Sequence, residues 1–229
     1  MEATGVYYEQ LTYFLDDNEI FVSVILPNQS KAYAKSLNLK SKTDKLDTMM
    51  LGQMGLERTL TQWKPISPKM RVLKQLTRDR VSLLEEKVAL LNKLHALKSS
   101  HLPHQDAIKR LKQRIQLVKQ QIKEVEKQIK QVIKADPALE QKIEKITRIK
   151  GLGLVTVATI IAETDTEVSV FKLITSRSQL VSYAGYDVVQ RQSGSSIKGK
   201  TKISKKGNKF IRSPDNHRDT FSCYCYGQA

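Results

Sequence analysis

The most regular pattern in the chain is a run of apolar residues that recur every three or four positions between residues 108 and 132. Eight positions follow this spacing without a break, and β-branched side chains dominate: Ile108, Leu111, Ile115, Val118, Ile122, Val125, Ile129 and Val132. Upstream, four leucines recur at intervals of seven: Leu76, Leu83, Leu90 and Leu97. Heptad spacing of this kind is typical of coiled coils, and Pro103 separates the two runs. We therefore predict a long antiparallel coiled coil over residues 65–136, with two ordinary bundle helices as the alternative.

The N-terminal quarter has a different pattern, in which apolar residues have helical spacing over residues 5–19 and a β-branched run follows at 20–27. From Lys42 a second helical pattern places one leucine and three methionines on one side: Leu46, Met49, Met50 and Met54. The segment 1–60 is therefore predicted to be a small α/β unit. One strand in so short a unit cannot have both faces covered, so the remaining strands of its sheet would have to come from elsewhere.

Residues 137–163 contain two helical patterns joined by a turn with Gly151 and Gly153. Two short helices on such a turn resemble the helix-hairpin-helix unit, whose turn amides and following helix N-terminus bind a backbone phosphate. A plain helix-helix turn with glycine at the C-cap is the alternative. A further short helix is expected to end at Gly185, so the region 137–213 is predicted to be a mostly α domain.

Charge is unevenly distributed over the 229 residues, which carry 39 Lys and Arg against 23 Asp and Glu and a net charge of +16. Residues 1–60 have a net charge of −2, and the remainder has a net charge of +18. This excess favours a nucleic-acid partner over an acidic membrane surface, because no segment pairs a basic face with Trp or Phe. No apolar run approaches the roughly 18 residues that span a bilayer, and no secretory segment is evident, so we expect a cytoplasmic protein without membrane contact.

The basic segment, defined here as residues 198–212, carries seven positive side chains and no acid: Lys198, Lys200, Lys202, Lys205, Lys206, Lys209 and Arg212. Its Ser, Gly and Lys composition predicts a loop. Repulsion between these charges favours a loop that grips phosphate over one that is only solvated. Together with Arg191, Gly151 and Gly153, these residues are the predicted nucleic-acid-binding set.

Among the acids, Asp44 and Asp47 lie three residues apart on a predicted helix, so their carboxylates emerge on one face about one turn apart. This geometry suits a shared Mg²⁺, which prefers oxygen ligands and bridges to phosphate. A pair of solvated surface acids is the alternative.

The ordered motifs of residues 1–213 together resemble the insertion-sequence 110 family of transposases, the DEDD recombinases guided by a bridge RNA. The motifs are Glu2-Ala3-Thr4-Gly5, Lys42-Thr43-Asp44-Lys45-Leu46-Asp47, Tyr183-Ala184-Gly185-Tyr186, Gln192-Ser193-Gly194 and Ile203-Ser204-Lys205-Lys206-Gly207-Asn208. The resemblance implies that residues 1–60 are part of an RNase H-like (RuvC-like) domain that holds Mg²⁺ through four acids. It also implies that a separate C-terminal transposase domain supplies a serine nucleophile.

Carried over by residue, Glu2, Asp44 and Asp47 match three of the family's four metal-binding acids. The first aspartate of the family has no counterpart, and residues 214–229 do not continue the family pattern. We therefore expect an incomplete copy, truncated at the N-terminus and altered at the C-terminus. Ser193 matches the family's serine, with Ser195 and Ser196 as close rivals.

The resemblance thus implies a transposase that binds DNA and catalyses strand exchange with a guide RNA and Mg²⁺. The coiled coil is expected to join copies of the chain into a homo-oligomer. The alternative is a non-catalytic, dimerising coiled-coil protein that binds nucleic acid.

Overall fold

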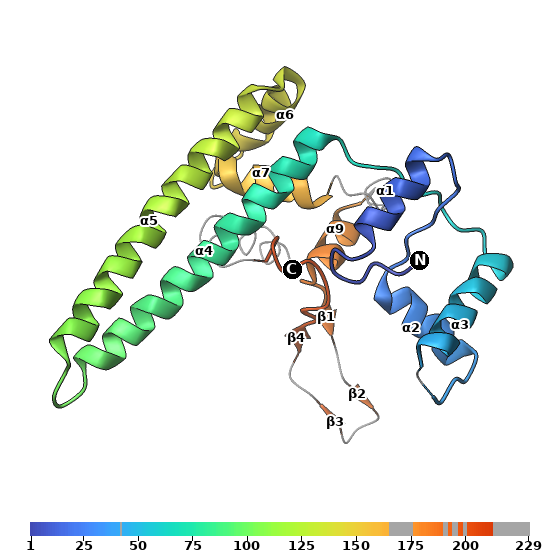
Figure 1. The fold of residues 1–229 in the computed structure, drawn as a ribbon, viewed down its shortest axis with the longest axis horizontal. Coiled ribbons are helices and arrows are strands. Elements are labelled where there is room, and N and C mark those ends of the chain that lie inside the picture. The colour runs from blue at the N-terminus through green and yellow to red at the C-terminus, as the bar shows by residue number, and fades with distance from the viewer. Residues whose placement is uncertain (42, 165–175, 190–191, 194–196, 199–200, 213–229) are drawn as a thin grey trace. The chain divides into compact units, whose positions relative to one another are not determined.

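The computed structural model describes residues 1–41, 43–164, 176–189, 192–193, 197–198 and 201–212 (Figure 1). These residues are mostly helical, with eight α-helices and four strands of two residues each. They divide into two compact units, residues 1–66 and the described residues from 67 onward. Within the described ranges, no helix is both long and apolar enough to cross a membrane.

The first unit contains three helices: α1 (Glu9–Asp17), α2 (Pro27–Ser36) and α3 (Asp44–Glu57). Helices α1 and α3 were predicted, whereas α2 was not. Pro27 stands at the first turn of α2, where its fixed φ suits a helix and its missing N–H is not needed. The predicted strand at 20–27 is wrong, because residues 20–26 form no strand and Pro27 begins this helix. Of the described backbone in that segment, only Ile25 forms a β-bridge, parallel to Glu2.

Residues 22–25 nevertheless run through the middle of this unit. The Ala3 N–H donates to the Ile25 carbonyl at 2.8 Å, and the Trp63 N–H donates to the Val22 carbonyl at 2.8 Å. Two clusters of buried apolar side chains lie along the segment: Val22, Val24 and Trp63 form the first, and Ile25, Tyr33, Met50 and Met54 form the second. The described residues of this unit form no sheet, so the RNase H-like fold stays a prediction.

The second unit begins with two long helices, α4 (Pro68–Lys98) and α5 (Gln105–Lys134), which pack against each other as an antiparallel hairpin (Figure 1). Ser67 caps α4 by accepting the Met70 N–H at 3.3 Å. The predicted apolar positions of α5 form its inner face, where six are buried: Ile108, Ile115, Val118, Ile122, Val125 and Ile129. Each such side chain contributes about 1.5–3 kcal/mol on burial. The two long helices agree with the sequence pattern, and a coiled coil in the strict sense stays a prediction.

Helices α6 (Pro137–Thr147) and α7 (Leu154–Thr164) pack on the end of the hairpin that holds the start of α4 and the end of α5. Asp136 caps α6 through a 3.2 Å hydrogen bond from the Leu139 N–H. The largest apolar core lies among these four helices and includes Leu73, Ile129, Ile143 and Val157, all fully or almost fully buried. This core fixes α7 as a rigid support for the C-terminal elements.

The last described elements are α9 (Arg177–Ala184) and a narrow antiparallel ribbon. Strand β1 (Val188–Val189) pairs with β4 (Lys202–Ile203), and β2 (Gln192–Ser193) pairs with β3 (Ile197–Lys198). The predicted loop is therefore wrong where these strands form. The Ser and Gly residues of this stretch predicted a loop, but the β-branched Val188, Val189, Ile197 and Ile203 favour strands.

Candidate active site and nucleic-acid interface

The carboxylate of Glu2 is held by two hydroxyl groups. Ser30, in the first turn of α2, donates to Glu2 Oε2 at 2.5 Å, and Thr4 donates to Oε1 at 3.2 Å. The backbone bridge to Ile25 fixes the residue beside α2. Both carboxylate oxygens of Glu2 thus already accept a hydrogen bond.

Asp44 and Asp47 occupy the first turn of α3, as the sequence predicted. Thr43 caps this helix, with its Oγ1 accepting the Leu46 N–H at 3.2 Å. Asp44 is exposed and Asp47 is half-buried. Acidic side chains in the first turn also stabilise a helix through its dipole, so their place has a structural explanation in addition to a catalytic one.

The structure does not gather the three acids into a metal site. Among the described residues, no group of three or more His, Cys, Asp or Glu is placed to hold a metal ion. The hydroxyl groups of Ser30 and Thr4 hold the Glu2 carboxylate against α2 and its neighbouring segment. As placed, these residues do not fit a Mg²⁺ ion.

Ser193 ends strand β2, and its backbone is paired with Ile197 across the ribbon. Lys198 lies on β3 and is paired with Gln192. Other predicted residues, namely Arg191, Lys200, Ser195 and Ser196, lie outside the described residues.

Exposure is described for four lysines of the basic segment, and all four are exposed: Lys202, Lys205, Lys206 and Lys209. The Lys209 ammonium lies 5.0 Å from the centre of the Phe210 ring. Arg212 differs from them, because its guanidinium donates to the Ala184 carbonyl at 2.5 Å and so fastens the segment to α9. The lysines remain accessible to a ligand, whereas Arg212 has a structural role.

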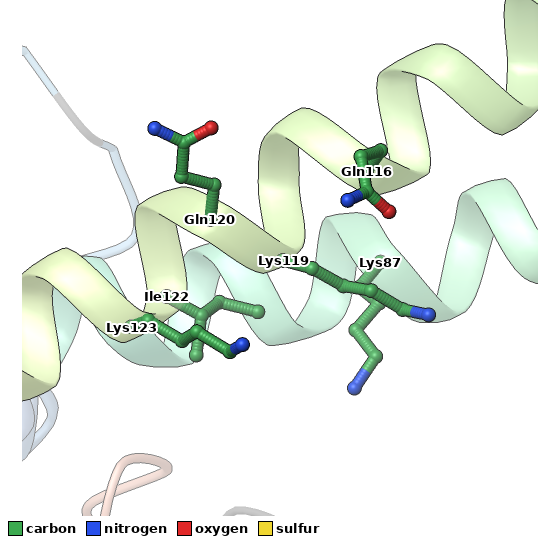
Figure 2. Close-up of a pocket in the computed structure, with 6 residues that line it drawn as sticks. All are labelled: Lys87, Gln116, Lys119, Gln120, Ile122 and Lys123. Carbon is green, nitrogen blue, oxygen red and sulfur yellow. The ribbon is translucent and has the colours of Figure 1, made fainter.

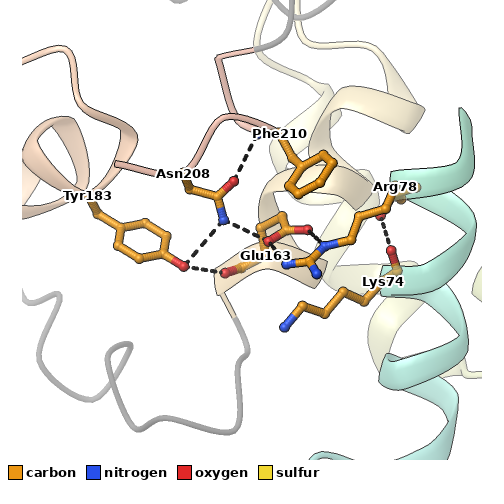
Figure 3. Close-up of polar contacts among 7 residues, drawn as sticks. Lys74, Arg78, Glu163, Tyr183, Asn208 and Phe210 are labelled. Carbon is orange, nitrogen blue, oxygen red and sulfur yellow. Dashed lines mark hydrogen bonds and ion pairs between the residues drawn. The ribbon is translucent and has the colours of Figure 1, made fainter. Parts of the chain in front are cut away.

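The buried carboxylate of Glu163 holds the basic segment in place through polar contacts (Figure 3). Its side chain is fully buried on α7. Arg78 of α4 binds it in a two-pronged ion pair, with Nε to Oε1 at 2.7 Å and Nη2 to Oε2 at 3.0 Å. Asn208 Nδ2 donates to Glu163 Oε2 at 2.7 Å. One carboxylate thus joins α4, α7 and the basic segment.

Neighbouring contacts extend this network. The Tyr183 hydroxyl of α9 donates to the Glu163 backbone carbonyl at 2.9 Å, and the Phe210 N–H donates to Asn208 Oδ1 at 2.9 Å. The Arg78 guanidinium lies 4.6 Å from the centre of the Phe210 ring, a cation–π contact. These contacts hold the backbone of residues 208–210 in one conformation.

The sequence motifs include Asn208, but they did not reveal Glu163 or Arg78, which lie far from it along the chain. One signal was available, because Glu163 is the sole charged residue in the mostly apolar helix α7. A carboxylate on a buried helix requires a partner, and a basic side chain elsewhere in the chain is the expected one.

Two glycines allow the basic segment to approach α9 closely. Gly185 ends α9 in the left-handed region at φ +73°, and its carbonyl accepts the Lys205 N–H at 3.0 Å. A Cβ on Gly207 would overlap the Tyr183 carbonyl oxygen and would lie 2.7 Å from the Gly185 nitrogen. The glycines of the Tyr-Ala-Gly-Tyr and Lys-Gly-Asn motifs therefore meet each other in the fold.

Gly151 and Gly153 lie in the turn between α6 and α7. Gly151 has φ +91°, and the Gly153 carbonyl accepts the Val157 N–H at 3.0 Å, at the start of α7. This is the predicted pair of helices on a glycine turn. Its assignment as a helix-hairpin-helix that binds phosphate stays a prediction.

Comparisons with known proteins define the family. A family model for DEDD transposases of the IS110 type, described as "Transposase", matches residues 1–103. A second model, described as "Transposase IS116/IS110/IS902 family", matches residues 143–214. The protein belongs to the IS110 family of transposases, as the sequence motifs indicated.

Two curated relatives are similar over most of the chain. The pilin gene-inverting proteins of Moraxella bovis and Moraxella lacunata are each 29% identical over 221 residues, which is 93% of this chain. The chain spans 63% of the length of each of these relatives.

Proposed function

We propose that this protein is a DNA recombinase of an insertion sequence, which binds DNA through the basic segment and exchanges strands through Ser193. The observation that carries the proposal is the bond between Asn208 and Glu163. It fixes a backbone that presents Lys205, Lys206 and Lys209 to solvent, immediately after the ribbon that contains Ser193. The names of the two relatives support recombination chemistry, because gene inversion requires DNA strands to be cut and rejoined.

In the proposed step, Ser193 Oγ forms a bond to a DNA phosphorus atom while the bond from that phosphorus to one deoxyribose oxygen breaks. The serine proton goes to a base or to water, and the departing oxygen takes up a proton. Reversal of the step by another strand end releases the serine. Lysines next to the phosphate would stabilise the added negative charge in the transition state.

Further parts of the proposal derive from the family. Glu2, Asp44 and Asp47 are proposed to contribute to a site for a divalent ion, Mg²⁺, which would supply Lewis-acid activation of the phosphate. The described geometry does not fit such a site, so no step here depends on it. A bridge RNA is the proposed guide, and a cytoplasmic location is proposed.

The proposed domain division assigns residues 1–60 to the metal-binding domain, 65–136 to the coiled coil and 137–213 to the C-terminal transposase domain. Self-association through the hairpin is part of this proposal. It is supported by two apolar side chains on α4 that are open to solvent, Val88 at 56% and Leu91 at 40% exposure.

A second function, a dimerising protein that binds nucleic acid without catalysis, is favoured by one observation. The described residues bring no three acids together into a metal site of the kind that the family resemblance implies. The two proposals share DNA binding and differ in whether Ser193 reacts.

Covalent trapping separates them. The full chain is incubated with a labelled duplex carrying the sequences that flank its gene, and denaturing electrophoresis detects protein joined to DNA. The recombinase proposal expects an adduct that Ser193→Ala abolishes and that Ser195→Ala and Ser196→Ala retain. DNA binding without any adduct would favour the non-catalytic protein. An adduct that is lost only in Ser195→Ala or Ser196→Ala would assign the nucleophile to that serine.

A further inference from the structure

A groove on the helical hairpin is lined by basic and amide side chains (Figure 2). Its volume is about 440 Å³, and it lies where α4 and α5 pack together. Lys87 comes from α4, and the other lining residues come from α5: Gln116, Lys119, Gln120, Ile122 and Lys123. The lining therefore has three ammonium groups, two amides and no acid.

In this groove a lysine occupies an inner position of α4. Lys87 lies four residues after Leu83 and three before Leu90, where the spacing would otherwise place an apolar residue. Its side chain is only half-buried, because the long stem can cover apolar surface while the ammonium reaches water. The buried Ile122 stands opposite on α5 and forms the apolar floor.

Acids near the groove have partners other than its lysines. Glu126 pairs with Arg80 at 2.8 Å, and Glu86 pairs with Arg114 at 3.7 Å. Glu124 accepts a 3.0 Å hydrogen bond from Gln120. Across the described chain, no ion pair joins an acid to Lys87, Lys119 or Lys123. Three like charges lining one groove repel each other, so an anionic ligand there would be stabilised.

Exposed lysines continue the groove along one flank of α5. Each lies one position after a residue of the apolar pattern, so all share one side of the helix: Lys109, Lys112, Lys119, Lys123 and Lys130. At a rise of about 1.5 Å per residue, the row from Lys112 to Lys130 is about 27 Å long. A straight, rigid row of this length fits a straight, rigid polyanion.

The composition of the hairpin favours double-stranded nucleic acid as the ligand. Neither α4 nor α5 contains a Phe, Tyr or Trp, so the hairpin offers no ring on which unpaired bases could stack. A duplex instead presents closely spaced phosphates along a stiff rod, and lysines bind these without reading sequence. The transposase family indicates that the duplex is DNA.

We propose that the groove of Lys87, Lys119 and Lys123 is a second DNA-binding site, which holds the phosphate backbone of duplex DNA along the α4–α5 hairpin. This inference rests on the proposed function, since it adds a contact to the same DNA. It differs in its residues, which lie on the hairpin and not in the basic segment.

The test compares three variants of the full chain, each lacking three lysine charges. The groove variant carries Lys87→Gln, Lys119→Gln and Lys123→Gln. The segment variant carries Lys202→Gln, Lys205→Gln and Lys206→Gln. The control carries Lys31→Gln, Lys35→Gln and Lys40→Gln, which are exposed lysines of the first unit. Affinity for a labelled 30-base-pair DNA duplex is measured over a range of salt concentrations, and circular dichroism checks that each variant keeps its helices.

We expect the groove variant to bind the DNA at least about tenfold more weakly at low salt, with a plot of log affinity against log salt flatter by two to three units, about 0.9 per phosphate contact. The control should match the wild type. If the groove variant also matches the wild type while the segment variant is weakened, the second site is wrong and the proposed function stands. If the wild type shows no salt-dependent DNA binding, both fail. A loss seen with duplex RNA and not with DNA would also overturn the proposal.

Discussion

Glu163 and Asn208 are separated by 45 residues and joined by a 2.7 Å hydrogen bond from the asparagine amide to the buried carboxylate. Arg78 occupies the other side of the same carboxylate, 85 residues from it in the chain. The exposed lysines of the basic segment are therefore attached to a rigid core and not to a free loop. Because these charges are already held in place, binding of a polyanion costs less conformational entropy.

Replacing Glu163 by Ala should destabilise the second unit by about 2–4 kcal/mol, because Arg78 and Asn208 lose their shared partner inside the protein. Circular dichroism during urea unfolding measures this loss, since most of the helix lies in that unit. The chain has a single tryptophan, Trp63, in the first unit, so its fluorescence transition should move little.

The matched control is Glu86→Ala, which removes a carboxylate from an exposed pair with Arg114 whose atoms are 3.7 Å apart. We expect a cost of about 0–1 kcal/mol there. Equal effects of the two substitutions would contradict the anchoring role of Glu163.

Gly207→Ala should lower the free energy of unfolding markedly, although it adds only one methyl group. The added methyl would overlap the Tyr183 carbonyl oxygen, and both neighbours are backbone atoms that cannot rotate away. We expect a loss of about 1–3 kcal/mol, as for overpacking of a close contact, measured by the same unfolding experiment. Gly52→Ala in α3 has no heavy atom within 4 Å of the new methyl, so it should stabilise the first unit by about 0.5–1 kcal/mol.

Glu57 should make the first unit sensitive to acid. The Tyr33 hydroxyl donates to Oε2 of Glu57 at 2.6 Å and the Gln53 amide donates to Oε1 at 2.6 Å, and these bonds lower the pKa of Glu57. The unfolded state then binds the proton more readily, so the stabilisation is present above the ordinary glutamate pKa of about 4.3 and is lost as the pH falls through the lower folded pKa.

Trp63 fluorescence in urea, measured in steps from neutral pH to about pH 3, follows this loss. The variant Glu57→Gln should lose less stability with falling pH than the wild type. A wild-type and variant pair with the same pH slope would show that the Tyr33 bond has no such effect.

The hairpin was the part of the fold that sequence predicted best, because burial repeats locally along a helix. The apolar residues from Ile115 to Ile129 recur every three or four positions, because one face of α5 is buried along its whole length. The short strands were missed for the opposite reason. Val188 pairs with Ile203 across the ribbon, and a two-residue strand has too few positions to show alternation.

The site was only partly predictable. The motifs marked Asn208 and Gly185 as special, and the fold explains these two as a carboxylate partner and a left-handed C-cap. Glu163 and Arg78 could not be paired from the sequence, because nothing local connects residues on α4 and α7. The groove around Lys87 was hidden similarly, since it depends on which face of α4 turns toward α5.

If the basic segment binds DNA phosphates from a fixed position, its lysines should account for part of the salt dependence of duplex DNA binding. The full chain and its Lys202→Gln, Lys205→Gln and Lys206→Gln variant are titrated onto the same duplex over a range of salt. We expect log affinity to fall steeply with log salt for the wild type, and the slope of the variant to be flatter by about two to three units. An unchanged slope in a variant that keeps its helices would contradict this expectation.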